Sequence, residues 1–186
     1  MTTKEFKKKW LSQGDSLTPI DLEVLSGLHL KETSIDFLVN AGLPISAAPF
    51  LTFTTKSLQQ FNPISTLNDI YGFLGKEFRQ YVVIGFDGSG NPITINTSKN
   101  DVIQLLDHDN YFSPHYFNNS IEILFEFLLI YRDFIRGKGD DFTDEEFDIL
   151  KDRMEAIDPS VFKESGFWKE MLEIDIANRD DFRANP

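Results

Sequence analysis

The stretch IGFDGSGNPITIN (residues 84–96) decides the fold class that we predict for this chain. Apolar residues on both sides enclose a short segment rich in Gly, Asp and Asn. Asp and Asn tolerate left-handed backbone angles, Gly adopts them freely, and Pro92 can open a strand. The stretch therefore predicts a β-hairpin with Gly88, Gly90 and Asn91 in its turn.

Individual residues of this stretch exclude three kinds of functional loop. A dinucleotide-binding fingerprint needs a third glycine and a helix behind it, whereas these glycines lead into a strand. A nucleophile elbow needs glycines two residues before and after its serine, and Ser89 has Asp87 and Asn91 there. A calcium loop that began at Asp87 would have Pro92 at the position of the required glycine. A structural turn is therefore the favoured interpretation.

The flanking sequence continues the hairpin into an antiparallel meander. QYVVIGF (residues 80–86) is rich in β-branched and aromatic residues, and PITIN (residues 92–96) alternates apolar and polar positions. DVIQLL (residues 101–106) predicts the next strand, and APFLTF (residues 48–53) predicts one upstream. No periodic pattern assigns residues 57–80.

Helical periodicity predicts helices on both sides of the meander. The longest, residues 121–135, is apolar nearly all round, so we expect most of its surface to be buried as the spine of the core. Asn119 or Ser120 caps its start. RGKGDD (residues 136–141) predicts a linker behind it. The other predicted helices are residues 4–12, 31–40, 144–157 and 167–174.

Length and composition predict a single domain over residues 1–186. We expect its core at about residues 28–135 and an acidic helical segment at about residues 140–176. The chain has no cysteine, which excludes cysteine nucleophiles and thiolate zinc sites. No apolar run reaches the roughly 20 residues of a membrane span, so a cytoplasmic protein without membrane attachment is expected.

The net charge of −12 restricts the classes of partner. Direct nucleic-acid binding needs a basic face that releases counterions, so this charge argues against it. An acidic surface attracts and orients basic partners, although solubility alone also accounts for such a charge. Residues 136–186 hold 15 acidic and 8 basic residues and are the more acidic part of the chain.

Two groups of carboxylates are candidates for binding a partner. In the meander, Asp87 of the hairpin lies near Asp107 and Asp109, which follow the next strand. This group is preferred because a sheet holds it, which lowers the entropy lost on binding. The second group lies in a run that also contains Phe142 and Phe147, and consists of Asp140, Asp141, Asp144 and Glu145.

The segment LDHDNYFSPHYF (residues 106–117) is the remaining candidate for chemistry. An extended strand would point Asp107 and Asp109 to one side and His108 to the other, so the three would not converge on a metal ion. We therefore predict no metal site and no catalytic residue. An enzyme or small-ligand protein that uses Asp107, Asp109 and His115 is the alternative.

The order of these motifs resembles that of the SUKH superfamily, in particular its bacterial immunity-protein families. The similar motifs cover roughly residues 28–175. In chain order they are a helix that ends at G-L-P, an A-P-F-L strand, the I-G-x-D-G-x-G-x-P-I hairpin, a strand that ends near L-D-H-D and a capped helix. That helix begins N-N-S-I here and N-S-S-L in the families. Residues that map onto the hairpin, where they shape the fold, are Gly85, Asp87, Gly90, Asn91 and Pro92.

The resemblance implies an α+β fold, a mostly antiparallel sheet with helices packed against it, without catalytic residues or a cofactor. It further implies a protein that binds and blocks a toxin domain, often a nuclease or another nucleic-acid-modifying enzyme, in a bacterial toxin system. The expected partner is then a protein with a basic surface. The alternative is an intracellular protein–protein interaction adaptor of the same fold, because some members of the superfamily serve as adaptors.

Overall fold

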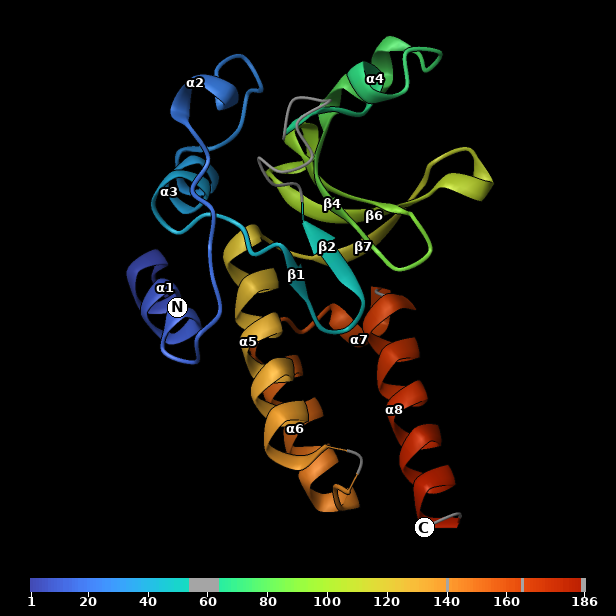
Figure 1. The fold of residues 1–186 in the computed structure, drawn as a ribbon. Coiled ribbons are helices and arrows are strands. Elements are labelled where there is room, and N and C mark those ends of the chain that lie inside the picture. The colour runs from blue at the N-terminus through green and yellow to red at the C-terminus, as the bar shows by residue number, and fades with distance from the viewer. Residues whose placement is uncertain (54–63, 140, 165, 185–186) are drawn as a thin grey trace.

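An antiparallel sheet with helices on both faces makes up the protein, so the predicted α+β class is confirmed (Figure 1). The computed structural model describes residues 1–53, 64–139, 141–164 and 166–184. The strands are β1 (Ser46–Ala47), β2 (Leu51–Phe53), β3 (Ser65–Thr66), β4 (Tyr81–Phe86), β5 (Pro92–Asn96), β6 (Val102–Asp107) and β7 (Ser113–Asn118).

The helices surround the sheet on several sides. In Figure 1, α5, α6 and α8 extend below the sheet, α1 to α3 lie to its left, and α4 lies above it. The α-helices are α1 (Thr3–Leu11), α2 (Leu22–Leu25), α3 (Glu32–Asn40), α4 (Leu67–Ile70), α5 (Ile121–Lys138), α6 (Asp144–Ile157), α7 (Val161–Glu164) and α8 (Gly166–Ala184). Short 3₁₀ turns are η1 (Lys76–Gln80), η2 (Thr97–Lys99) and η3 (His108–Asn110).

The predicted meander is present as β4-β5-β6-β7, with β2 and then β1 added beyond β4. Two differences from the prediction stand out. Residues 48–50 form the turn between β1 and β2, so the upstream strand is shorter than APFLTF. The strand β7 was missed because it contains Pro114, which lacks an N–H; β7 ends the strand order, where a proline is tolerated.

The two faces of the sheet bury different clusters. Alternate residues of β4 divide between them: Val82 and Ile84 join the large core, and Tyr81 and Val83 join a smaller one under α4 and η1. The large core also contains Phe6 of α1 and Trp168 of α8, besides residues of the meander. Each fully buried side chain of this size contributes about 1.5–3 kcal/mol of hydrophobic free energy.

Helix α5 is the spine of the large core, as predicted. Ser120 is its N-cap, and the Ser120 hydroxyl accepts a hydrogen bond of 3.3 Å from the N–H of Ile123. The helix continues to Lys138 and stops at Gly139, whose φ of 57° is left-handed. The predicted linker is therefore wrong over its first three residues, because the helix runs through them.

A polar cluster joins the C-terminal helices to the sheet. Asp158, at the end of α6, accepts hydrogen bonds from the Tyr116 hydroxyl (2.7 Å) and the Asn118 side-chain amide (3.3 Å). The Asn118 side-chain oxygen Oδ1 in turn accepts a hydrogen bond of 3.1 Å from the indole N–H of Trp168. Both Asn118 and Trp168 are fully buried, so these bonds fix where α8 begins relative to β7.

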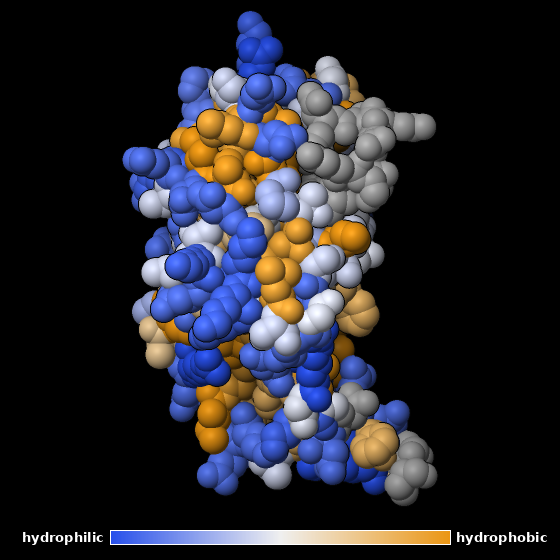
Figure 2. Space-filling view, turned by 60° about the vertical axis from the view of Figure 1, so that its left-hand side comes forward, coloured by the Kyte–Doolittle hydropathy of each residue, from blue (hydrophilic) through white to orange (hydrophobic). Residues whose placement is uncertain are grey.

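The outer face of α1 to α3 is mainly hydrophilic, and a hydrophobic patch lies near its upper end, at the level of α2 (Figure 2). Among the described residues, no helix combines the length and the apolar character that crossing a bilayer requires.

Candidate partner-binding cleft

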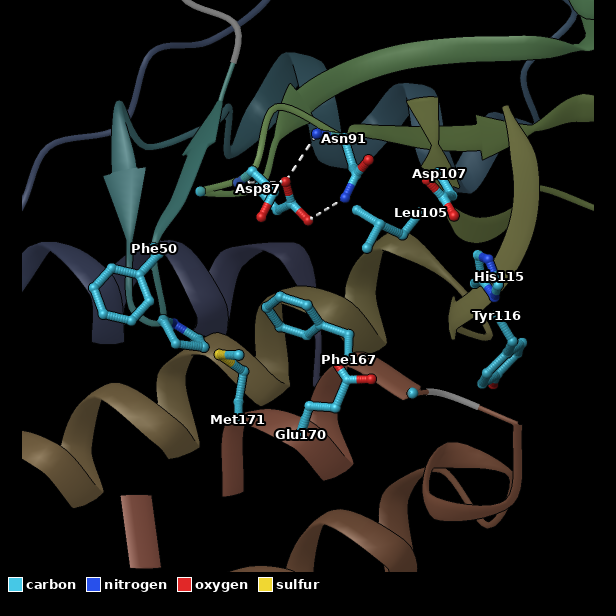
Figure 3. Close-up of a pocket in the computed structure, with 14 residues that line it drawn as sticks. Phe50, Asp87, Asn91, Leu105, Asp107, His115, Tyr116, Phe167, Glu170 and Met171 are labelled. Atoms are coloured by element: carbon cyan, nitrogen blue, oxygen red, sulfur yellow. Dashed lines mark hydrogen bonds between the residues drawn. The ribbon is translucent and has the colours of Figure 1, made fainter. Parts of the chain in front are cut away.

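The β4–β5 turn holds the Asp87 carboxylate in one orientation. One carboxylate oxygen accepts hydrogen bonds from the N–H groups of Ser89 (2.9 Å) and Asn91 (2.8 Å). The other accepts a 2.9 Å bond from the Asn91 side-chain amide (Figure 3). Gly90 has a φ of 87°, a backbone angle that a residue with a side chain adopts only with strain. The turn therefore presents a rigid carboxylate.

Strand β2 and the β1–β2 turn pack closely against this hairpin at two of its glycines. A Cβ atom on Gly85 would lie 2.5 Å from the Thr52 carbonyl oxygen, so β2 can approach only a glycine there. A Cβ atom on Gly88 would lie 3.1 Å from Cβ of Phe50. Phe50 itself has a φ of 55° and is 77% exposed, so an unusual backbone conformation presents an aromatic ring to solvent.

Asn91 also ties the hairpin to the β6–β7 connection. Its side-chain oxygen Oδ1 accepts a 3.1 Å hydrogen bond from the N–H of His108 and lies 2.7 Å from His108 Nδ1. Residues 108–110 form the turn η3 and not an extended strand, so the predicted alternation of Asp107, His108 and Asp109 is wrong. The reason is a local cap: the Asp107 carboxylate accepts a 3.1 Å bond from the N–H of Asp109.

A cleft of about 590 Å³ opens between this end of the sheet and the first turns of α8 (Figure 3). We call it the hairpin-end cleft. Its apolar lining includes Leu105 of β6 and Phe167 and Met171 of α8, and Phe50 lies at one side. Its polar lining includes Asp87, Asp107, His115, Tyr116 and Glu170. No Lys or Arg side chain is in the described lining.

The cleft collects some of the residues that the sequence singled out and not others. Asp87, Asp107 and His115 all line it. Asp109 does not; its side chain is 88% exposed and lies 3.4 Å from His108 Nε2. Glu170 is an addition that the sequence did not predict, because its place depends on how α8 docks, which no local pattern encodes.

The titratable side chains of the cleft include a tyrosine whose hydroxyl is fixed by a carboxylate. Burial, reinforced by the hydrogen bond to Asp158, raises the pKa of Tyr116 far above its usual value, so this hydroxyl stays protonated and donates to Asp158. In the part of the chain that the structure describes, no three His, Asp or Glu side chains are placed to hold a metal ion. The cleft thus offers carboxylate acceptors beside apolar and aromatic walls.

In the second acidic group, near the start of α6, Asp141 and Asp144 are paired within the protein, whereas Glu145 is exposed and has no ion pair with a described residue. Asp144 forms a 2.6 Å ion pair with Arg179, and Asp141 lies 3.6 Å from Arg183. Phe142 and Phe147 are buried, so neither ring is available to a partner. Asp140 lies outside the described residues.

Comparison with known proteins gives one match. A family model described as SUKH-4 immunity protein matches residues 10–174. Neither the curated proteins nor the solved structures gave a match.

Proposed function

The chain belongs to the SUKH-4 immunity protein family, and on that premise we propose that it protects its cell by binding a toxin domain and blocking that domain's active site. It acts by occupying a surface and not by catalysis, and it needs no cofactor. The toxin is a nuclease or another enzyme that modifies nucleic acid. The encounter takes place in the cytoplasm, before the toxin reaches its substrate.

The unpaired acidity of the hairpin-end cleft is the observation that supports this proposal most. Enzymes that act on nucleic acid carry basic clefts for phosphate, and a carboxylate surface imitates the phosphate charges. Asp87 and Asp107 supply such charges from the sheet and Glu170 supplies one from α8. The net charge of −12 steers a basic toxin toward the protein over a longer range.

The test is to produce the full chain together with the C-terminal domain of any large multidomain protein encoded beside it. We expect a stable complex and suppression of that domain's toxicity in cells. A chain that neither co-purifies with such a domain nor protects against it would contradict the immunity proposal and favour an adaptor role.

A charge reversal locates the docking surface in the same assay. Asp107→Lys with Glu170→Lys should weaken the complex by on the order of 100-fold or more, because like charges then face a basic partner. The matched control reverses two exposed acids of α6, Asp152→Lys with Glu155→Lys, and should leave protection intact. Equal effects of the two double variants would exclude the cleft as the docking site while leaving the immunity proposal standing.

A further inference from the structure

The carboxylates of the hairpin-end cleft lack a cationic partner within the protein. The Glu170 carboxylate makes neither a hydrogen bond nor an ion pair with any described residue. One Asp107 oxygen caps η3 and the second has no such partner in the described part of the chain. Asp87 also lines the cleft, and the described lining contains no Lys or Arg. The cleft therefore has three negative charges that a ligand can meet. A cationic group would therefore complement this cleft.

The walls of the cleft add a second requirement. Leu105, Phe167 and Met171 form apolar surface between the carboxylates, and the ring of His115 lies near Asp107 (Figure 3). A small hydrated cation gains nothing from such walls. A side chain with an apolar stem and a flat, delocalised charge packs on them, because a guanidinium stacks on aromatic rings and pairs with carboxylates at its edge.

The site is also ordered before any ligand arrives. Three hydrogen bonds hold the Asp87 carboxylate, and a cap holds Asp107. At the side of the cleft, Phe50 keeps a left-handed φ of 55° although its ring is 77% exposed. Strained residues of this kind gather where a structure binds a partner. Ordered groups lose little entropy on binding, so they suit a contact that contributes much of the affinity.

We propose that the hairpin-end cleft accepts an arginine side chain of the toxin, whose guanidinium pairs with Asp107 and Glu170 while its stem packs on Leu105 and Met171. The inference rests on the proposed function for the identity of the partner, and it specifies the residue type that the partner inserts. A lysine fits less well, since its compact ammonium neither stacks on a ring nor pairs with two carboxylates in one plane.

The experiment titrates N-acetyl-arginine amide into the isotope-labelled full chain and follows its NMR spectrum. We expect saturable shifts confined to the cleft, above all at Leu105, His115 and Met171. Asp107→Asn with Glu170→Gln keeps the shape of both side chains and should weaken binding at least 10-fold. The matched control, Asp152→Asn with Glu155→Gln on α6, removes the same charge and should bind as the wild type does.

N-acetyl-lysine amide serves as the comparison probe and should bind at least 5-fold more weakly. Shifts scattered over the surface, lysine binding as tight as arginine binding, or an unchanged titration of the cleft double variant would each overturn the inference. Because the probe is a small molecule, this outcome is independent of the toxin assay. Arginine binding without toxin binding would refute the proposed function and leave the cleft assignment in place.

Discussion

The hairpin-end cleft and the start of α6 are both acidic, and they differ in how many of their acids are paired with a basic side chain. At α6, Asp144 pairs with Arg179 and Glu146 pairs with Lys138, so these charges are neutralised inside the protein. In the cleft, Asp107 and Glu170 have no basic partner among the described residues. If the cleft docks the toxin as proposed, the comparison teaches that unpaired charge, and not the density of acidic residues, indicates a docking surface.

Aromatic residues separate the two regions in the same way. Phe142 and Phe147 lie within the acidic run but are buried, where their rings stack at 5.7 Å between centroids. Phe50 beside the cleft is exposed. An aromatic anchor contributes to binding only if a partner can reach it. Of these two regions, as far as the structure describes them, the cleft is the one that has an exposed aromatic ring beside carboxylates without a basic partner.

The largest expected effect concerns an acid that belongs wholly to the structure. Asp158 is 3% exposed and accepts hydrogen bonds from Tyr116, Asn118 and Asn119. Asp158→Ala leaves the buried Asn118 amide and the half-buried Tyr116 hydroxyl without this acceptor and should lower the free energy of unfolding by about 3–5 kcal/mol. Urea unfolding monitored by the fluorescence of Trp10 and Trp168 measures it.

The cleft double variant sharpens this contrast in the same unfolding experiment. Asp107→Asn with Glu170→Gln should change the free energy of unfolding by no more than about 0.5 kcal/mol, as is usual for surface substitutions. Asp158→Asn keeps one acceptor oxygen and should fall between the two. A loss below about 1 kcal/mol for Asp158→Ala would show that Asp158 does not join β7 to the C-terminal helices as described.

Local sequence predicted the sheet better than it predicted the cleft. The hairpin and α5 depend on neighbouring residues, such as the Asp87 turn and the Ser120 cap, and both could be predicted. The cleft depends on α8, which is fixed by the bond between Trp168 and Asn118, 50 residues apart. No pattern in one sequence reveals that pairing. The ion pair between Asp144 and Arg179, which lie 35 residues apart, could not be predicted for the same reason.

The next effect in size is the salt dependence of association with the toxin. Unpaired cleft charges attract a basic partner, and salt screens that attraction over about 8–10 Å at physiological strength. We expect the association rate constant to fall by roughly 10-fold between 20 mM and 500 mM NaCl, as stopped-flow fluorescence would measure. Asp107→Asn with Glu170→Gln should flatten that dependence.

The matching change at the start of α6 tests whether pairing matters more than charge. Asp144→Asn removes an acid that Arg179 already neutralises, so it should alter the salt dependence less than a single cleft substitution such as Glu170→Gln does. If Asp144→Asn proved the more effective of the two, the distinction between paired and unpaired acids would not govern docking.

The smallest expected effect is a change in acid stability at the start of α6. A hydrogen bond from Lys138, together with the N–H of Thr143, lowers the pKa of Glu146 below its usual value. The unfolded chain therefore binds a proton at Glu146 more readily than the folded chain does. The stabilisation from Glu146 is complete above the ordinary glutamate pKa of about 4.3, and it is lost as the pH falls through the lower pKa of the folded state.

Glu146→Gln should accordingly destabilise the protein at pH 7, and its difference from the wild type should shrink as the pH falls below about 4. Thermal unfolding between pH 7 and pH 3 measures this difference. Lys138→Gln removes the main cause of the lowered pKa and should shift the acid profile in the same direction. If the difference stayed constant over the whole range, Glu146 would contribute through its capping geometry alone. The charges at the start of α6 would then contribute less to stability than the ion pairs indicate.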